Sequence, residues 1–71
     1  MQLIDQSIGK RVTLLTTSGS ELEGVLMGLD PSANCVLLDV EERRPHDPLF
    51  KPRKLDSSLV NGATISIIVP A

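Results

Sequence analysis

Residues 22–29, LEGVLMGL, are mostly apolar, and their two glycines fall on the side that carries leucines. Gly24 and Gly28 share a face with Leu22 and Leu26. A glycine inside a strand weakens it but permits strong bending and the close approach of another backbone. The pattern therefore predicts a strand that bends sharply.

A polar turn follows this strand and leads into a second predicted strand. The turn DPSAN, residues 30–34, begins with aspartate, has proline second and ends with asparagine, and each of these residues favours turns. The run after it is expected to place one set of residues on each face: Val36, Leu38 and Val40 on one, Leu37, Asp39 and Glu41 on the other. Residues 19–42 thus predict a bent hairpin with a short polar tip.

The segments on either side of this hairpin predict one short helix and three strands. Residues 1–8 have apolar side chains spaced for about two turns of amphipathic helix, and Gly9 stands where a C-cap glycine belongs. Residues 10–17, 54–60 and 64–69 are rich in β-branched and apolar side chains, which favours strands. Asn61-Gly62 is the strongest short turn signal in the chain.

Residues 43–53, RRPHDPLFKPR, form the least regular segment. Three prolines exclude a helix and a paired central strand, so a surface loop is expected. Charge is segregated there, because residues 43–54 carry a net +4, residues 1–42 a net −5 and the whole chain −2. A solvated, variable loop is the favoured interpretation of this basic segment, and a contact with nucleic-acid phosphates is the alternative.

The composition excludes several kinds of site. Cys35 is the only cysteine and is expected in the core, and His46 is the only histidine, so a disulfide, a Cys/His metal site and a His-based triad are not expected. Asp39, Glu41 and Glu42 have no basic or nucleophilic partner placed with them and are interpreted as the solvent face of a strand. With no membrane-length apolar run and no signal peptide, we expect a soluble intracellular protein. Because no set of side chains suits catalysis or metal binding, we also expect no catalytic activity, no cofactor and no small-molecule substrate.

The last strand indicates oligomerisation. The run TISIIV, residues 64–69, is apolar, β-prone and uncharged, and would aggregate as an open edge. A strand from another chain would remove that hazard, so obligate oligomerisation through strand pairing is predicted. The turns at 30–34 and 61–62 can lie at one end of such a fold, where Asn34 and Asn61 would offer amide groups to a base edge. From spacing alone, the preference of turns for asparagine is the favoured explanation of both residues, and spacing assigns them no function.

Two motifs resemble those of the Sm-like (LSm) family over nearly the whole chain. Gly19, Gly24, Gly28, Asp30, Asn34, Asp39 and Glu42 reproduce the first Sm motif, and Val60-Asn61-Gly62 with Ile65 resembles the second. The chain is therefore identified as a single Sm/LSm domain over residues 1–71, with the first motif at about 10–42, a variable loop at 43–53 and the second motif at about 54–69. LIDQSIGKRV and KLDSSLVNGATISIIVP are most similar to the fifth LSm subunit type.

The resemblance implies an all-β Sm fold with a short N-terminal helix and a five-stranded, strongly bent, antiparallel SH3-like barrel. It implies seven-membered rings in which the fourth strand of one subunit pairs with the fifth strand of its neighbour, with uridine-rich single-stranded RNA near the pore. The implied RNA-binding residues are Asp30, Ser32, Asn34, Asn61 and Gly62, with Asn34 on a base edge and Asp30 holding it. The implied interface residues are Arg53, Leu55, Leu59, Thr64, Ile65, Ile67 and Ile68.

The sequence departs from the family pattern at three positions of this site. Ser32 stands where an aromatic or other flat side chain commonly stacks on the base, and Asn61 replaces an arginine. Stacking is worth about 1–3 kcal/mol per base, so a weaker pocket is expected. Ala63 stands where a further asparagine is frequent, and nothing functional follows from it.

The resemblance implies an RNA-binding subunit of a heteroheptameric LSm ring in the nucleus and the cytoplasm. Its partners would be other LSm subunits and the uridine-rich 3′ ends of U6 small nuclear RNA, in splicing, and of deadenylated mRNA, in decapping and decay. A homomeric Sm-like ring and a structural ring or adaptor subunit without RNA contact remain as alternatives.

Overall fold

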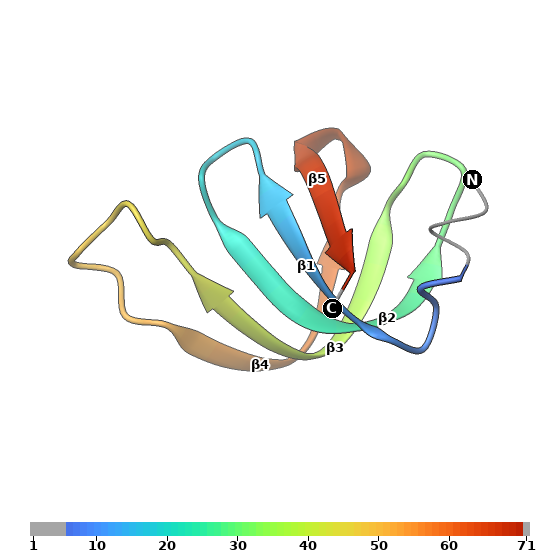
Figure 1. Cartoon of the computed structure of the whole chain (residues 1–71), viewed down its shortest axis with the longest axis horizontal. Coiled ribbons are helices and arrows are strands. Elements are labelled where there is room, and N and C mark those ends of the chain that lie inside the picture. The colour runs from blue at the N-terminus through green and yellow to red at the C-terminus, as the bar shows by residue number, and fades with distance from the viewer. Residues whose placement is uncertain (1–5, 71) are drawn as a thin grey trace.

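A computed structural model describes residues 6–70 of the chain, which form five strands and one short 3-10 helix. All neighbouring strands are antiparallel, in the order β4-β3-β2-β1-β5 (Figure 1). The elements are β1 (Arg11–Thr16), β2 (Glu21–Leu29), β3 (Cys35–Arg43), β4 (Arg53–Val60), η1 (Gly62–Thr64) and β5 (Ile65–Pro70). The five predicted strands are thus confirmed.

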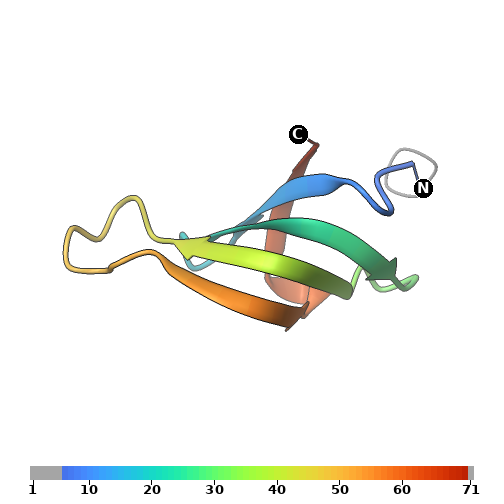
Figure 2. The same cartoon turned by 90° about the horizontal axis from the view of Figure 1, so that it is seen from below.

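The sheet bends strongly without closing on itself. Figure 2 shows β5, in red, crossing the other strands at a steep angle. Within the described chain β4 pairs only with β3 and β5 only with β1, so these two strands form the margins of the sheet. Asn61-Gly62 therefore does not close a β4–β5 hairpin but leads through η1 from one margin to the other.

The predicted N-terminal helix is not found in its described part. Residues 1–5 of that prediction lie outside the described residues, and Gln6 to Gly9 form hydrogen-bonded turns. Gly9 has φ 83°, a conformation that favours glycine, and its N–H donates to the carbonyl of Leu26 at 2.7 Å. This glycine thus ties the N-terminal turn to β2. No helix among the described residues has the length and apolarity needed to cross a membrane.

The core is aliphatic and lies inside the bend of the sheet. Cys35 is fully buried, as predicted, and burial raises the pKa of its thiol above its usual value. Four partly buried side chains, Leu29, Leu55, Ile65 and Ile68, pack against the core. The core consists of Val12, Leu14, Leu22, Leu26, Cys35, Leu37, Val40 and Val60.

Gly24 explains how β2 and β3 approach so closely inside the bend. A Cβ at this position would lie 2.9 Å from the backbone oxygen of Leu38 and 3.2 Å from a methyl group of Val40. Any side chain would therefore push the two strands apart. The predicted role of this glycine as a point of close backbone approach is confirmed.

The predicted faces of the second hairpin strand are wrong, because Val40 does not share a face with Val36 and Leu38. Leu37 is fully buried, whereas Val36 and Leu38 are 39% and 40% exposed. The cause is a bulge: the register of β2 against β3 shifts between Glu23 and Val25, and Asp39 has φ 54°. A bulge inserts one extra residue and so reverses the alternation. Odd-numbered residues face the core before Asp39, and Val40 and Glu42 do so after it.

The acidic residues of β3 also differ from the prediction, because basic partners lie beside them. Arg43 pairs with Glu41 at 2.6 Å and with Glu23 at 3.0 Å. Arg11 pairs with Asp39 across the bulge. The predicted solvent face is therefore an ion-pair network on the outer side of the sheet.

The segment between β3 and β4 is a loop, as predicted, and it has internal order. The N–H of Asp47 donates to the carbonyl of Arg44 at 3.0 Å, and the N–H of Phe50 donates to the carbonyl of Asp47 at 3.1 Å. The guanidinium of Arg44 lies 4.6 Å from the centroid of the Phe50 ring. Figure 1 shows this loop at the opposite end of the β2–β3 hairpin from the turn at residues 30–34.

Candidate RNA-binding site

The turn between β2 and β3 is built on the carboxylate of Asp30. Its Oδ1 accepts hydrogen bonds from the backbone N–H groups of Ser32 and Asn34, both at 2.9 Å. Its Oδ2 accepts a hydrogen bond from Nδ2 of Asn34, also at 2.9 Å. Aspartate at the first position of a turn commonly makes such bonds to the backbone that follows. Asp30 thus holds the Asn34 carboxamide in place, as the resemblance implied.

The same carboxamide joins this turn to the second motif. Oδ1 of Asn34 accepts a hydrogen bond from the backbone N–H of Gly62 at 2.7 Å. The prediction that the two turns lie at one end of the fold is therefore confirmed. Within the protein, Nδ2 of Asn34 donates one hydrogen bond and Oδ1 accepts one. One N–H of Nδ2 and one acceptor position of Oδ1 therefore remain for a ligand.

Gly62 is required because the two turns touch. A Cβ on Gly62 would lie 2.1 Å from the backbone oxygen of Ser32 and 2.7 Å from the carbonyl carbon of Ala33. No side chain fits within those distances. Its role is to let the second turn close against the first.

Asn61 serves its own turn rather than reaching across to Asn34. Its Oδ1 accepts a hydrogen bond from the N–H of Ala63 at 2.9 Å, which caps η1. The two predicted carboxamides therefore differ in role: Asn34 bonds across to the other turn, whereas Asn61 bonds within its own turn. Ser32 lies exposed at the tip of the first turn. Its backbone oxygen lies against Gly62, the residue that follows Asn61.

The acidity of Asp30 follows from these contacts. The hydrogen bond from the Asn34 side chain, together with those from the backbone N–H groups of Asn34 and Ser32, lowers its pKa below the usual value of 3.8. Asp30 is exposed, so it is the hydrogen bonds and not a buried charge partner that stabilise the carboxylate. The site therefore carries a fixed negative charge near neutral pH.

One residue that sequence reasoning missed is Ala33. It has φ 63°, in the left-handed region that alanine rarely adopts. Alanine gives no sequence signal for this conformation, unlike glycine or asparagine. Its N–H donates to the carbonyl of Asp30 at 2.9 Å, which keeps the turn tight against Gly62.

Six of the seven predicted interface residues lie on the two strands that form the margins of the sheet, and Thr64 does not. Leu59 on β4 and Ile67 on β5 are 77% and 55% exposed. Leu55, Ile65 and Ile68 instead contribute partly to the core. Thr64 belongs to η1, where its hydroxyl donates to the carbonyl of Asn61 at 2.7 Å. Each of the two margin strands, β4 and β5, thus combines an exposed apolar side chain with a backbone edge that is unpaired in the described chain.

The residues described offer no site for a bound metal ion, because no three of their His, Cys, Asp or Glu side chains are grouped for one. The chemistry available at the joined turns is hydrogen bonding by fixed amide and carboxylate groups. That chemistry suits recognition of a polar ligand edge.

Together, the bent antiparallel sheet, its two open margins and the turns joined through Asn34 define a small β domain that presents one fixed polar site. The family model of the LSM domain matches residues 2–70. The chain belongs to the LSM-domain family.

Two relatives place the resemblance within the family. The chain is 39% identical to "Sm-like protein LSM5" of Arabidopsis thaliana, over 97% of this chain and 78% of the relative. It is 34% identical to "Probable U6 snRNA-associated Sm-like protein LSm5" of Dictyostelium discoideum, over 99% and 72%. The resemblance to the fifth LSm subunit type is thereby confirmed.

Two solved structures share the fold. The Pyrococcus abyssi Sm protein in complex with a uridine heptamer has a TM-score of 0.87 and 26% identity, over 99% of this chain and 94% of that one. A heptameric archaeal Sm protein has a TM-score of 0.86 and 27% identity, over 100% and 98%. The Sm fold predicted from the motifs is confirmed.

Proposed function

We propose that this chain is an RNA-binding subunit of a heteroheptameric LSm ring that binds uridine-rich 3′ ends. The observation that carries the proposal is the Asn34 carboxamide, held between Asp30 and Gly62 with one donor and one acceptor position free. A similar Sm protein is known in complex with a uridine heptamer. The proposed role is binding, without chemistry on the RNA.

The free amide positions match the edge of uracil. Uracil carries an N–H donor beside a carbonyl acceptor on its base-pairing edge, and sequence-specific recognition of RNA mostly reads such edges in single strands. A carboxamide supplies one donor and one acceptor in the same plane. Because Asn34 is already fixed, it loses little conformational freedom when a base binds.

The pocket is proposed to be weak. Ser32 cannot stack on a base, and the Asn61 oxygen caps its own turn. The pocket therefore lacks the stacking that a flat side chain would supply and the cation–π interaction that an arginine would supply. The subunit is therefore proposed to contribute to ring closure as much as to base capture.

Ring formation is proposed to use the two sheet margins. β4 and β5 each have one edge without a partner in the described chain, and each exposes a large apolar residue, Leu59 and Ile67. An open, apolar edge is a template for another strand. Arg53, Leu55, Thr64, Ile65 and Ile68 are proposed to border the same junctions, and a similar archaeal Sm protein is heptameric.

Two rings are proposed to contain this subunit. A relative is described as probably U6 snRNA-associated, which supports a nuclear ring on U6 small nuclear RNA in pre-mRNA splicing. A cytoplasmic ring on the 3′ ends of deadenylated mRNA, in decapping and decay, is the second proposed setting. The partners are then the other LSm subunits and uridine-rich single-stranded RNA.

A structural or adaptor role without direct RNA contact is the alternative that one observation favours. Asn61 is a neutral residue whose side-chain oxygen caps η1, so the second turn offers RNA neither a cationic group nor that oxygen. A homomeric ring is less favoured, because all seven pockets would then lack the arginine.

The test is oligouridine binding by a reconstituted ring that contains Asn34→Ala. We expect the mixed ring to assemble and its oligouridine affinity to fall about fivefold, as expected for the loss of one hydrogen-bonding group. Gln6→Ala is the matched control, since it removes an exposed carboxamide outside the site. Unchanged affinity in an intact ring would favour the adaptor role, and failure of assembly would make Asn34 a structural residue only.

A further inference from the structure

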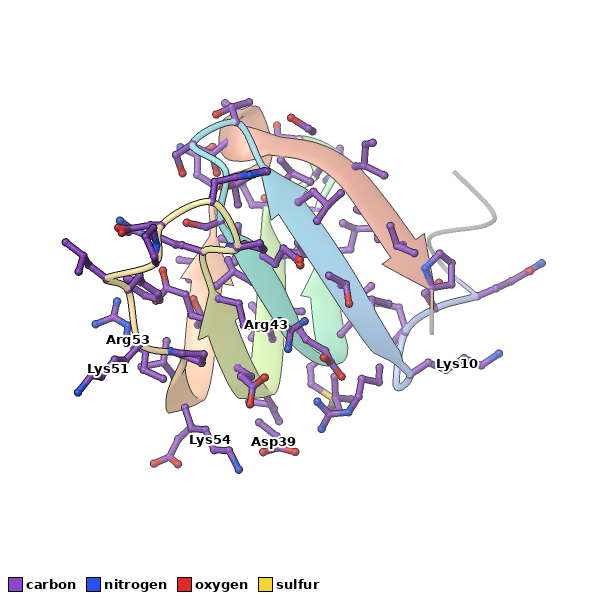
Figure 3. The ribbon with its side chains drawn as sticks, turned by 60° about the vertical axis from the view of Figure 1, so that its left-hand side comes forward. Lys10, Asp39, Arg43, Lys51, Arg53 and Lys54 are labelled. Carbon is purple, nitrogen blue, oxygen red and sulfur yellow. The ribbon has the colours of Figure 1, made fainter. Side chains whose placement is uncertain are left out.

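The two margins of the sheet differ in charge. No charged residue occurs in residues 57–71, so β5 is neutral along its whole length. The opposite margin begins with Lys51, Arg53 and Lys54, which we call the basic strip. Figure 3 shows these three side chains on the β4 side of the sheet, with Lys10 on the far side.

Arg53 of the basic strip shares its carboxylate partner, Glu42, with Arg44. Glu42 is only 8% exposed, and its Oε1 lies 2.6 Å from Nε of Arg53. Its Oε2 lies 3.8 Å from a guanidinium nitrogen of Arg44. Within residues 6–70 neither arginine has another carboxylate at ion-pair distance, so the cluster keeps a surplus positive charge. The side chain of Arg53 is 62% exposed, and its two Nη groups have no ion-pair partner in that range.

We propose that the start of β4 selects a neighbouring subunit whose fifth strand carries an acidic side chain close to Arg53. The inference rests on the proposed ring, in which β4 pairs with the fifth strand of a neighbour. A carboxylate there would receive the free guanidinium N–H groups in a charge-assisted hydrogen bond. A second copy of this chain would instead place its neutral β5 against β4. The guanidinium of Arg53 would then be partly removed from water without gaining a carboxylate partner. Arg53 therefore favours a mixed ring over self-assembly.

An RNA backbone is the other polyanion that could meet the basic strip, and two observations favour a protein strand. Arg53 begins β4, whereas the joined turns follow Val60 at its other end, about 20 Å away at the usual rise per residue. Figure 1 places the β3–β4 loop and the 30–34 turn at opposite ends of the hairpin. Arg53 also lies on an open strand edge, where the backbone groups recruit a strand.

The experiment introduces an acid into β5 and measures self-association of the chain by native mass spectrometry at several protein concentrations. Ser66→Glu and Val69→Glu place the acid near either end of β5, so either strand direction is tested. The variant whose acid falls near Arg53 is expected to self-associate about threefold more tightly per junction, as expected for an exposed ion pair. The gain should vanish near 1 M salt.

Matched variants make the result specific. Ser66→Gln and Val69→Gln add side chains of the same size without charge and should show no gain. Arg53→Gln combined with the acidic variant should abolish the gain, whereas Lys51→Gln, which removes the same charge outside β4, should retain it. Absence of any gain, or a gain that survives Arg53→Gln, would overturn the inference.

The other LSm subunits separate this inference from the proposed function. If the unmodified chain enters no mixed ring at all, the proposed ring itself fails. If it enters mixed rings and Arg53→Gln does so equally well, the ring stands and the inference is overturned. An Arg53→Gln ring that assembles normally but binds oligouridine more weakly would also overturn it, since the basic strip would then contact RNA.

Discussion

Oδ1 of Asn34 lies 2.7 Å from the backbone nitrogen of Gly62 and accepts its hydrogen bond, which joins two turns that are 28 residues apart in the sequence. Asp30 orients the asparagine from the other side. The end of the fold that carries the candidate base site is thus held by one carboxamide. The geometry of the candidate base site therefore depends on the same hydrogen bonds that stabilise the two turns.

Replacement of Gly62 by alanine should disrupt this junction. The added Cβ would lie 2.1 Å from the backbone oxygen of Ser32, which is a rigid neighbour. We expect a loss of about 1–3 kcal/mol in the free energy of unfolding, measured by urea denaturation. Gly28→Ala is the control, because its Cβ would meet Val36 at an ordinary 3.6 Å. Equal stability of the two variants would contradict the close contact.

The hydrogen bonds to Asp30 predict an acid limit for the turn. Because they lower the folded-state pKa of Asp30 below 3.8, its contribution to stability is complete above that value. The contribution should disappear as the pH falls below about 4 through the lowered pKa. Asp30→Asn should be less stable than the unmodified protein at pH 7 and should lose less stability on acidification. Thermal unfolding of both proteins between pH 7 and pH 2 checks this, and parallel curves would contradict it.

The left-handed conformation of Asp39 predicts that two substitutions there change the free energy of unfolding by unequal amounts. Its φ of 54° suits glycine and is costly for a β-branched residue. Asp39→Val should lower the free energy of unfolding by about 1–3 kcal/mol. Asp39→Gly removes the same exposed ion pair with Arg11 but should change stability far less. If both variants lost the same amount, the ion pair rather than the backbone would be decisive.

A flat side chain at the tip of the first turn should strengthen RNA binding. Ser32 is exposed there, so Ser32→Phe should be accommodated without repacking the core. A stacked base is worth about 1–3 kcal/mol, so we expect the oligouridine affinity of the assembled ring to rise about tenfold. Ser18→Phe, in the exposed turn after β1, is the control for general stickiness. An equal rise for both variants would rule out stacking at this site.

The local patterns predicted the strands and the joined turns well, because their signals are short-range. Asp30, Asn34 and the Asn61-Gly62 pair have turn chemistry that acts within a few residues. Gly24 predicted the close approach of two backbones, because glycine weakens a strand and often marks such a position in a strand interior. The motif resemblance supplied the partner arrangement that periodicity alone could not.

The features that were mispredicted depend on tertiary pairing. Asp39 gives no sign in the sequence that a bulge forms there, so the prediction that Val36, Leu38 and Val40 share one face was wrong. Glu42 was predicted to lie on the solvent face without a basic partner, although it is only 8% exposed and pairs with Arg53. The capping role of Asn61 likewise depends on η1, a 3-10 turn that replaced the expected simple turn.

The most direct test of the ring proposal is native mass spectrometry of the purified chain mixed with the other LSm subunits, with and without oligouridine. The account predicts a seven-membered mixed ring that contains one copy of this chain and binds oligouridine. The same chain measured alone should not form a stable ring of seven identical subunits. A stable homoheptamer, or a chain that stays monomeric at micromolar concentration in the full mixture, would contradict the account.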